Sequence, residues 1–192
     1  MSKTEIIAIG DRSGSMGPIR TDAIGGFNAF IADQKTVPGD ATVTLVLFND
    51  TVETVFENKP LNDVEPLTSK TYAPSGNTAL YDAIGQTVSS AVWRHGRMDA
   101  SERPDKVIAV VLTDGQENMS RNYTLPSINA LITEQRNAGW EFVFLAANQD
   151  AFTGASQLGM DPNMSVSFEA TGEGVRSGYL STSKAVRSYR TA

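Results

Sequence analysis

The chain has 192 residues, with 16 Lys and Arg against 22 Asp and Glu, which leaves a formal charge of −6, and 40% of its residues are hydrophobic. These values are typical of a globular protein and exclude a disordered acidic segment and a fibrous repeat. The acidic balance argues against nucleic-acid binding, which needs clustered Lys and Arg, and the lack of Cys excludes disulfides and thiolate metal sites.

The N-terminal sequence and the apolar runs indicate where the protein is made. The first apolar run is too short for a signal peptide, and no run approaches the roughly 20 apolar residues of a transmembrane helix. We therefore expect a soluble cytoplasmic protein that makes no contact with a membrane.

The first part of the chain predicts a strand, a helix and a hairpin. Residues 6–9 form a short β-branched apolar run, which is typical of a strand buried on both faces. From Thr21 apolar residues recur at three- and four-residue spacing, which predicts an amphipathic helix. An Asn-Asp turn joins the runs 43–48 and 51–56, so the second of these strands is expected to lie antiparallel at an edge of the sheet.

The middle of the chain alternates helix and strand patterns. A Pro-rich connection at 59–77 is followed by a helical apolar stripe at 80–92. Residues 107–112 are the strongest buried-strand signal and predict a central strand. A further helix at about 128–132 precedes a further buried strand at 142–146.

The last part of the chain carries weaker patterns. They predict a short helix through Leu158, a brief strand near Val166 and a helix at about 171–189. Basic residues late in this helix, Arg190 among them, favour a solvated helix end, because cations complement the helix dipole there.

Alternating strands and helices predict an α/β protein with a mostly parallel sheet covered on both faces, and ligands bind such sheets at the carboxyl ends of the strands. Oxygen-bearing side chains gather in the loops expected at that end: Asp11, Ser13 and Ser15 follow the first predicted strand, Asp114 follows the central one, and Thr78 ends the Pro-rich connection just before the next helix. Hydroxyl and carboxylate oxygens suit a hard cation such as Mg²⁺ and suit zinc poorly. The sequence therefore predicts a cation site made from three loops.

This pattern resembles the von Willebrand factor type A (vWA) domain with its metal-ion-dependent adhesion site. That motif has Asp-x-Ser-x-Ser after the first strand, a Thr in a later loop and an Asp in a Thr-Asp-Gly turn after the central strand. The resemblance implies a doubly wound, Rossmann-like sheet with one antiparallel edge strand and helices on both faces. It also implies Mg²⁺ or Mn²⁺, with Ca²⁺ as a further candidate, held by Asp11, Ser13, Ser15, Thr78 and Asp114.

The resemblance also implies domain limits and a function. We expect a single domain over residues 1–192, with a core at about 4–147 and a C-terminal helical extension at about 150–192 that resembles stand-alone bacterial and phage members. In this family the cation commonly takes an Asp or Glu from a protein partner, and many members do no catalysis. We therefore expect a protein-binding module that is not an enzyme.

Other interpretations use the same residues. Asp11, Ser13 and Thr78 could each cap a helix, but capping explains them one at a time and leaves their joint placement unexplained. A Mg²⁺-dependent phosphotransferase or phosphatase of the haloacid dehalogenase type, using Asp11, is the alternative function; it would need Asp at the position of Ser13. In a third interpretation the cation only stabilises the fold.

Several residues outside the motif have ordinary explanations. Asp82 and Glu117 lie close in sequence to the motif and could be hydrogen-bond acceptors behind its ligands, but the default interpretation is that they are solvated carboxylates. His95 is interpreted as a cation at a helix end. Trp93 and Trp140 are expected to pack against the core.

Overall fold

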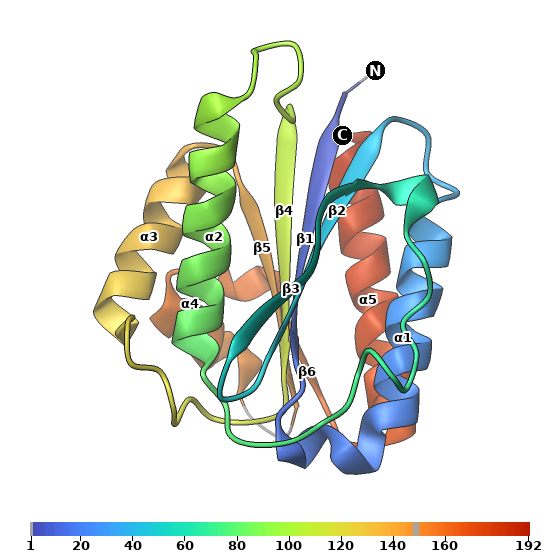
Figure 1. The fold of residues 1–192 in the computed structure, drawn as a ribbon, viewed down its shortest axis with the longest axis vertical. Helices are drawn as coiled ribbons and strands as arrows, with labels where there is room; N and C mark the ends of the chain where they lie inside the picture. Colours follow the sequence, from blue (N-terminus) through green and yellow to red (C-terminus); the bar gives the residue numbers. More distant parts are fainter. Residues whose placement is uncertain (1, 148–149) are drawn as a thin grey trace.

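A six-stranded sheet in the order β3-β2-β1-β4-β5-β6 forms the centre of the computed structural model, which describes residues 2–147 and 150–192 (Figure 1). The strands are β1 (Thr4–Asp11), β2 (Ala41–Phe48), β3 (Val52–Pro60), β4 (Lys106–Thr113), β5 (Glu141–Ala147) and β6 (Ser165–Phe168). All neighbouring strands are parallel except β2 and β3, which form the predicted hairpin at one edge. The predicted fold class is therefore confirmed.

Helices cover both faces of this sheet, with α1 and α5 on one face and α2, α3 and α4 on the other (Figure 1). The helices are α1 (Arg20–Gln34), α2 (Leu80–Arg97), α3 (Leu125–Asn137), α4 (Ala151–Leu158) and α5 (Gly172–Thr191). Short 3-10 helices occur at Gly14–Ile19, Leu61–Asp63 and Pro162–Met164. Among the described residues, no helix combines the length and apolar character needed to cross a bilayer.

Two hydrophobic cores result from the alternation of side chains along each strand. In β1, Ile6 packs into the core under α1 and α5, whereas Ile7 packs into the core under α2 and α3. Both side chains are fully buried. This burial on both faces explains why the central strands are continuous apolar runs.

Three side chains differ from the sequence expectations in burial. Val92 and Trp93 were predicted to pack against the core, but Trp93 is 65% exposed and stacks on Arg97, because this part of α2 faces outward. Arg190 was predicted to be solvated, but it is 6% exposed and donates to the main-chain oxygen of Gln34 at 2.7 Å. The cause is the packing of α5 against the end of α1.

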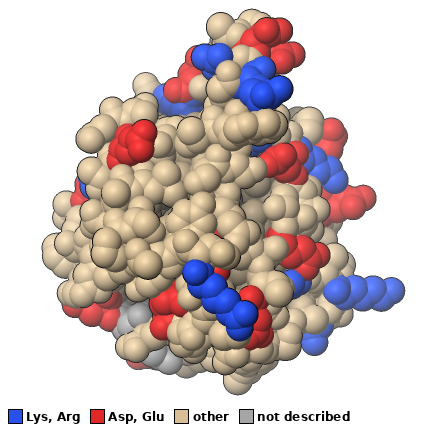
Figure 2. Space-filling view, turned by 60° about the vertical axis from the view of Figure 1, so that its left-hand side comes forward, with Lys and Arg blue, Asp and Glu red and all other residues tan. Residues whose placement is uncertain are grey.

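Charged side chains are interspersed on the side of the molecule turned forward in Figure 2, and much of that face is uncharged. The described part of this face therefore offers no continuous basic stripe of the kind that binds phosphate backbones.

Candidate metal centre

The predicted site residues meet at the carboxyl ends of the central strands, at the lower end of the sheet in Figure 1. Asp11 is the last residue of β1, and Ser13 and Ser15 follow it in the turn toward α1. Thr78 lies two residues before α2, and Asp114 follows β4. β1 and β4 are neighbours at the point where the strand order reverses, and this brings the loops at their carboxyl ends together, as in other doubly wound sheets.

Direct contacts join the first loop to the loop after β4. The hydroxyl oxygens of Ser13 and Ser15 are 3.1 Å apart. Ser15 Oγ donates to Asp114 Oδ1 at 2.7 Å. Asp11 Oδ1 accepts from the main-chain N–H of Ser13 at 2.7 Å, and Asp11 Oδ2 accepts from Thr113 Oγ1 at 2.7 Å. The two carboxylates and the serine hydroxyls therefore form one connected group.

Thr78 enters this group beside Gly115. A Cβ atom placed on Gly115 would lie 3.1 Å from Thr78 Oγ1 and 3.9 Å from Ser15 Oγ. Both hydroxyls therefore border the space that the glycine leaves open. The main chain of Thr78 is fixed by Asn118, whose Oδ1 accepts from Thr78 N–H at 3.0 Å and whose N–H donates to Thr78 O at 3.1 Å.

Burial gives the site its electrostatic character. Asp11, Ser13 and Thr78 are buried, while Asp114 is half-buried and Ser15 is exposed. Burial raises the pKa of Asp11, and hydrogen bonds from Thr113 and Ser13 only partly oppose it. Burial likewise raises the pKa of Asp114 against the opposing bond from Ser15. The site thus disfavours its own negative charge unless a cation is added.

The capping interpretation of the hydroxyls fails on geometry. Ser13 is the N-cap of the 3-10 helix at Gly14–Ile19, but its side chain makes no capping hydrogen bond. The N-cap of α2 is Ala79, so Thr78 is not the capping residue. Neither hydroxyl is therefore explained by the local helix that follows it.

The donor set fits a hard cation. Among the described residues, no group of three or more His, Cys, Asp or Glu side chains could hold a metal ion. A cation at this place would need the hydroxyls as well as the two carboxylates, and an all-oxygen set of this kind matches Mg²⁺, Mn²⁺ or Ca²⁺. The chain can thus supply such a site from the residues that the sequence pattern indicates.

The structure also shows supporting residues that sequence reasoning missed. Tyr72, from the Pro-rich connection, donates its hydroxyl to the main-chain oxygen of Asp11 at 2.5 Å. Asp50, in the hairpin turn, accepts from the side chain of Asn77 at 2.7 Å. The Pro-Gly composition marked this connection as a loop but gave no sign of these partners, which lie far away in the sequence.

The solvated interpretation of two carboxylates is wrong. Asp82 is buried and accepts from three main-chain N–H groups of the β4–α3 loop, at residues 121–123. Glu117 accepts from the main-chain N–H groups of Tyr81, Met119 and Ser120. Both carboxylates therefore organise the loop that carries Asp114.

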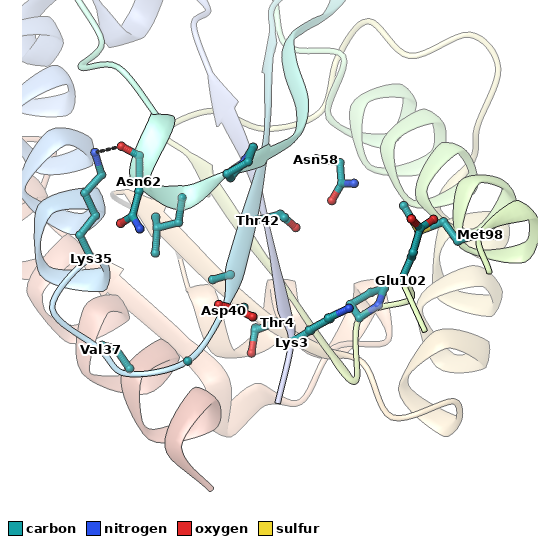
Figure 3. A pocket seen from close by; sticks show the side chains of 15 residues that line it. Lys3, Thr4, Lys35, Val37, Asp40, Thr42, Asn58, Asn62, Met98 and Glu102 are labelled. Carbon is teal, nitrogen blue, oxygen red and sulfur yellow. Dashed lines mark hydrogen bonds between the residues drawn. The ribbon is translucent and has the colours of Figure 1, made fainter. Parts of the chain in front are cut away.

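A cavity of about 550 Å³ lies at the opposite end, beside the start of β1 and β2 (Figure 3). Its lysines already have partners: Lys35 Nζ donates to the main-chain oxygen of Asn62 at 3.2 Å, and Lys3 Nζ donates to that of Ser101. These contacts tie both lysines to neighbouring loops.

The fold and the site together define a vWA domain. The family model for the von Willebrand factor type A domain matches residues 5–176, so the chain belongs to this family. Among curated proteins, no sequence is similar enough to match the chain.

A matrix protein of the mussel is among the solved structures that are similar to this chain. Proximal thread matrix protein 1 from the mussel byssus has a TM-score of 0.65 and 16% identity, over 97% of this chain and 46% of that one. Another structure of the mussel protein is described as having a zinc-occupied MIDAS motif, the metal-ion-dependent adhesion site. The present chain thus spans about half the length of the mussel protein.

Two bacterial pilus proteins are also similar. The pilus adhesin SpaC from Lactobacillus rhamnosus GG has a TM-score of 0.68 and 11% identity, over 97% of this chain and 30% of that one. The vWF domain of the pilus tip protein Mfa5 from Porphyromonas gingivalis has a TM-score of 0.66 and 10% identity, over 96% of this chain and 95% of that one. At these identities the similarities establish the fold.

Proposed function

We propose that this domain is a divalent-cation-dependent protein-binding module. One cation is held by Asp11, Ser13, Ser15, Thr78 and Asp114, and it takes an Asp or Glu side chain from a protein partner. The observation that carries this proposal is the convergence of oxygen donors from three separate loops on the space beside Gly115. The zinc-occupied site of the mussel protein supports it.

The donor set favours an anionic partner. Ser13, Ser15 and Thr78 are neutral, and both carboxylates share their charge with donors of this chain: Asp11 with the N–H of Ser13 and the hydroxyl of Thr113, and Asp114 with the hydroxyl of Ser15. Such a set would leave part of a cation's charge uncompensated, so a further carboxylate would be attracted. A bound cation would supply Lewis acidity and positive charge, and the exposed Ser15 lies on the side of the site that a partner can reach.

Mg²⁺ or Mn²⁺ is the proposed ion, because short hydroxyl and carboxylate ligands suit small hard cations. Ca²⁺ is the further candidate. It prefers more ligands at longer distances, so the five side chains would have to be supplemented by more water.

Binding without catalysis is favoured over phosphotransfer. A phosphotransferase of the alternative type would need a second carboxylate two residues after Asp11, but Ser13 occupies that position and contacts Ser15 at 3.1 Å. Asp11 is also buried, with both carboxylate oxygens engaged, which makes it a poor nucleophile for an incoming phosphate.

An array of glutamate-containing peptides, paired with the same peptides carrying Gln, tests this function. The EDTA-treated protein is applied with and without Mg²⁺, beside Asp114→Ala and the control Glu134→Ala, an exposed carboxylate on α3. We expect capture that requires both Mg²⁺ and Glu, is lost in Asp114→Ala and persists in the control. Capture that is equal with EDTA, or equal for Gln peptides, would contradict the proposal.

A further inference from the structure

The first turn of α2 is capped by a different loop. Its N-cap is Ala79, which has no side chain that can accept a hydrogen bond. Instead, Tyr81 N–H donates to Glu117 Oε2 at 2.9 Å, and Asp82 N–H donates to Ser120 Oγ at 2.9 Å. Since the first N–H groups of a helix have no partners within it, these two bonds do the work of a local cap.

Glu117 simultaneously folds its own loop. Its Oε1 accepts from Met119 N–H at 2.8 Å and from Ser120 N–H at 2.6 Å. Its Oε2 accepts from Ser120 Oγ at 2.7 Å, in addition to the bond from Tyr81. Each oxygen of Glu117 thus accepts two hydrogen bonds from this chain, whereas each oxygen of Asp11 accepts one. The lone pairs of Glu117 are therefore used within the chain, so it acts on the neighbouring elements rather than as a ligand for a cation.

Asp82 makes the reciprocal connection. It lies in the first turn of α2, is buried, and accepts from Arg121 N–H at 3.0 Å, from Asn122 N–H at 2.9 Å and from Tyr123 N–H at 2.9 Å. Side chains of the loop thus accept from the first N–H groups of α2, and Asp82 of α2 accepts from N–H groups of the loop. We call this pair of carboxylates, Glu117 and Asp82, the cross-loop clamp.

The contacts of the cross-loop clamp lie close in sequence to two of the proposed ligands. Thr78 precedes Tyr81 by three residues, and Asp114 precedes Glu117 by three residues. Asn118, next to Glu117 in the sequence, also bonds the main chain of Thr78 through its side-chain Oδ1 and its own N–H. Both ligands lie beyond the ends of their regular elements, and the bond from Tyr81 N–H to Glu117 joins the segments that follow them.

We infer that Glu117 is a positioning residue that sets the ion preference of the site. This inference rests on the proposed function. Mg²⁺ demands near-ideal octahedral geometry, whereas Ca²⁺ accepts irregular and variable coordination. A loosened separation between Thr78 and Asp114 therefore weakens Mg²⁺ binding more than Ca²⁺ binding, and an intact clamp favours the smaller ion.

Calorimetric titration of EDTA-treated protein with Mg²⁺ and with Ca²⁺ tests the inference on Glu117→Ala. The control is Asp161→Ala, which removes a carboxylate that caps a 3-10 helix far from the ligands in sequence by accepting from Asn163 N–H at 2.9 Å. We expect the Mg²⁺ dissociation constant to rise about tenfold in Glu117→Ala, the range seen when residues supporting metal ligands are removed, with a smaller rise for Ca²⁺. Asp161→Ala should change neither.

Hydrogen exchange gives a second readout that does not depend on an ion. In Glu117→Ala the N–H groups of Tyr81, Met119 and Ser120 should exchange faster, because they lose their acceptor. Glu117→Gln keeps one acceptor oxygen and should fall between the wild type and Glu117→Ala in both readouts; it replaces Glu117→Ala if that variant does not fold.

The outcomes separate this inference from the proposed function. If the wild type binds Mg²⁺ and Glu117→Ala keeps both its affinity and its preference over Ca²⁺, the inference is overturned and the proposed function stands. An equal loss in Asp161→Ala would also overturn it, since general destabilisation would then explain the effect. If the wild type binds neither ion, both the inference and the proposed function are contradicted.

Discussion

Two buried carboxylates on the same strand behave in opposite ways. Glu5 and Asp11 lie near the two ends of β1, and both residues are 0% exposed. Glu5 accepts from Arg94 Nη2 at 2.6 Å and from Thr44 Oγ1 at 2.7 Å, and its Oε2 lies 2.6 Å from His95 Nε2. None of the ion pairs among the described residues includes Asp11.

Their pKa values differ in the corresponding direction. Burial raises the pKa of Glu5, but bonds from His95 and Arg94 outweigh it, and the net pKa is lowered. Burial dominates at Asp11, whose pKa is raised. Glu5 therefore has its compensating charge within the chain, from Arg94, whereas none of the described residues provides an ion-pair partner for Asp11. A bound cation would supply it, which is why Asp11 is central to the proposed site.

Neutralising each carboxylate should have unequal effects on stability, and this is the largest expected effect. Glu5→Gln leaves the mostly buried guanidinium of Arg94 with only the more exposed carboxylate of Glu57, 3.6 Å from its Nε, and should lower the free energy of unfolding by about 3 kcal/mol. Asp11→Asn in EDTA removes a charge that forms no ion pair with the described residues, and should cost less than about 1 kcal/mol. Urea unfolding of both variants measures this; equal losses would abolish the distinction.

Adding a cation should compensate the negative charge of Asp11 and should leave that of Glu5 unaffected. At a Mg²⁺ concentration of about 100 times the dissociation constant, binding to the folded state stabilises it by about 2.7 kcal/mol. The wild type should therefore unfold at higher temperature in Mg²⁺ than in EDTA, whereas Asp11→Asn should show no shift. The control Glu134→Ala should shift like the wild type. A shift that survives in Asp11→Asn would place the ion elsewhere.

Lowering the pH should remove the contribution of Glu5 to the free energy of unfolding. Because the pKa of Glu5 is lowered by folding, its stabilising contribution is present above the unfolded value of about 4.3 and is lost as the pH falls through the folded value. The difference in unfolding free energy between the wild type and Glu5→Gln should thus be full at pH 7 and shrink below about pH 4. A difference independent of pH between 7 and 3 would show that the charge of Glu5 does not matter.

Two buried threonines, Thr87 and Thr78, should differ in their effect on Mg²⁺ affinity but not on stability. The hydroxyl of Thr87 is buried without a hydrogen-bond partner among the described residues, so Thr87→Val should leave stability and Mg²⁺ affinity nearly unchanged. Thr78→Val should also leave stability nearly unchanged in EDTA, but should weaken Mg²⁺ binding about tenfold or more. Calorimetry of the two variants side by side checks this; equal affinities would remove Thr78 from the ligand set.

The sequence predicts the strands and the candidate ligands better than it predicts the contacts between segments that are distant in the chain. The apolar run at 107–112 predicts β4, and the Asp-x-Ser-x-Ser spacing predicts which side chains gather at the end of β1, because both signals are local and repeat a simple period. The contacts by which Glu117 and Asp82 join α2 to the β4–α3 loop were not predictable, because they reach main-chain N–H groups more than 30 residues away. The burial of Arg190 against Gln34 was not predictable for the same reason, because the two residues are far apart in the sequence.

The most direct measurement of cation binding is a calorimetric Mg²⁺ titration of the EDTA-treated wild type beside Asp11→Asn. The proposal predicts one Mg²⁺ per chain for the wild type and no detectable binding for Asp11→Asn, with both proteins folded. Equal binding by the variant, or none by the wild type, would contradict the claim that the unpaired carboxylate of β1 is compensated by a metal ion.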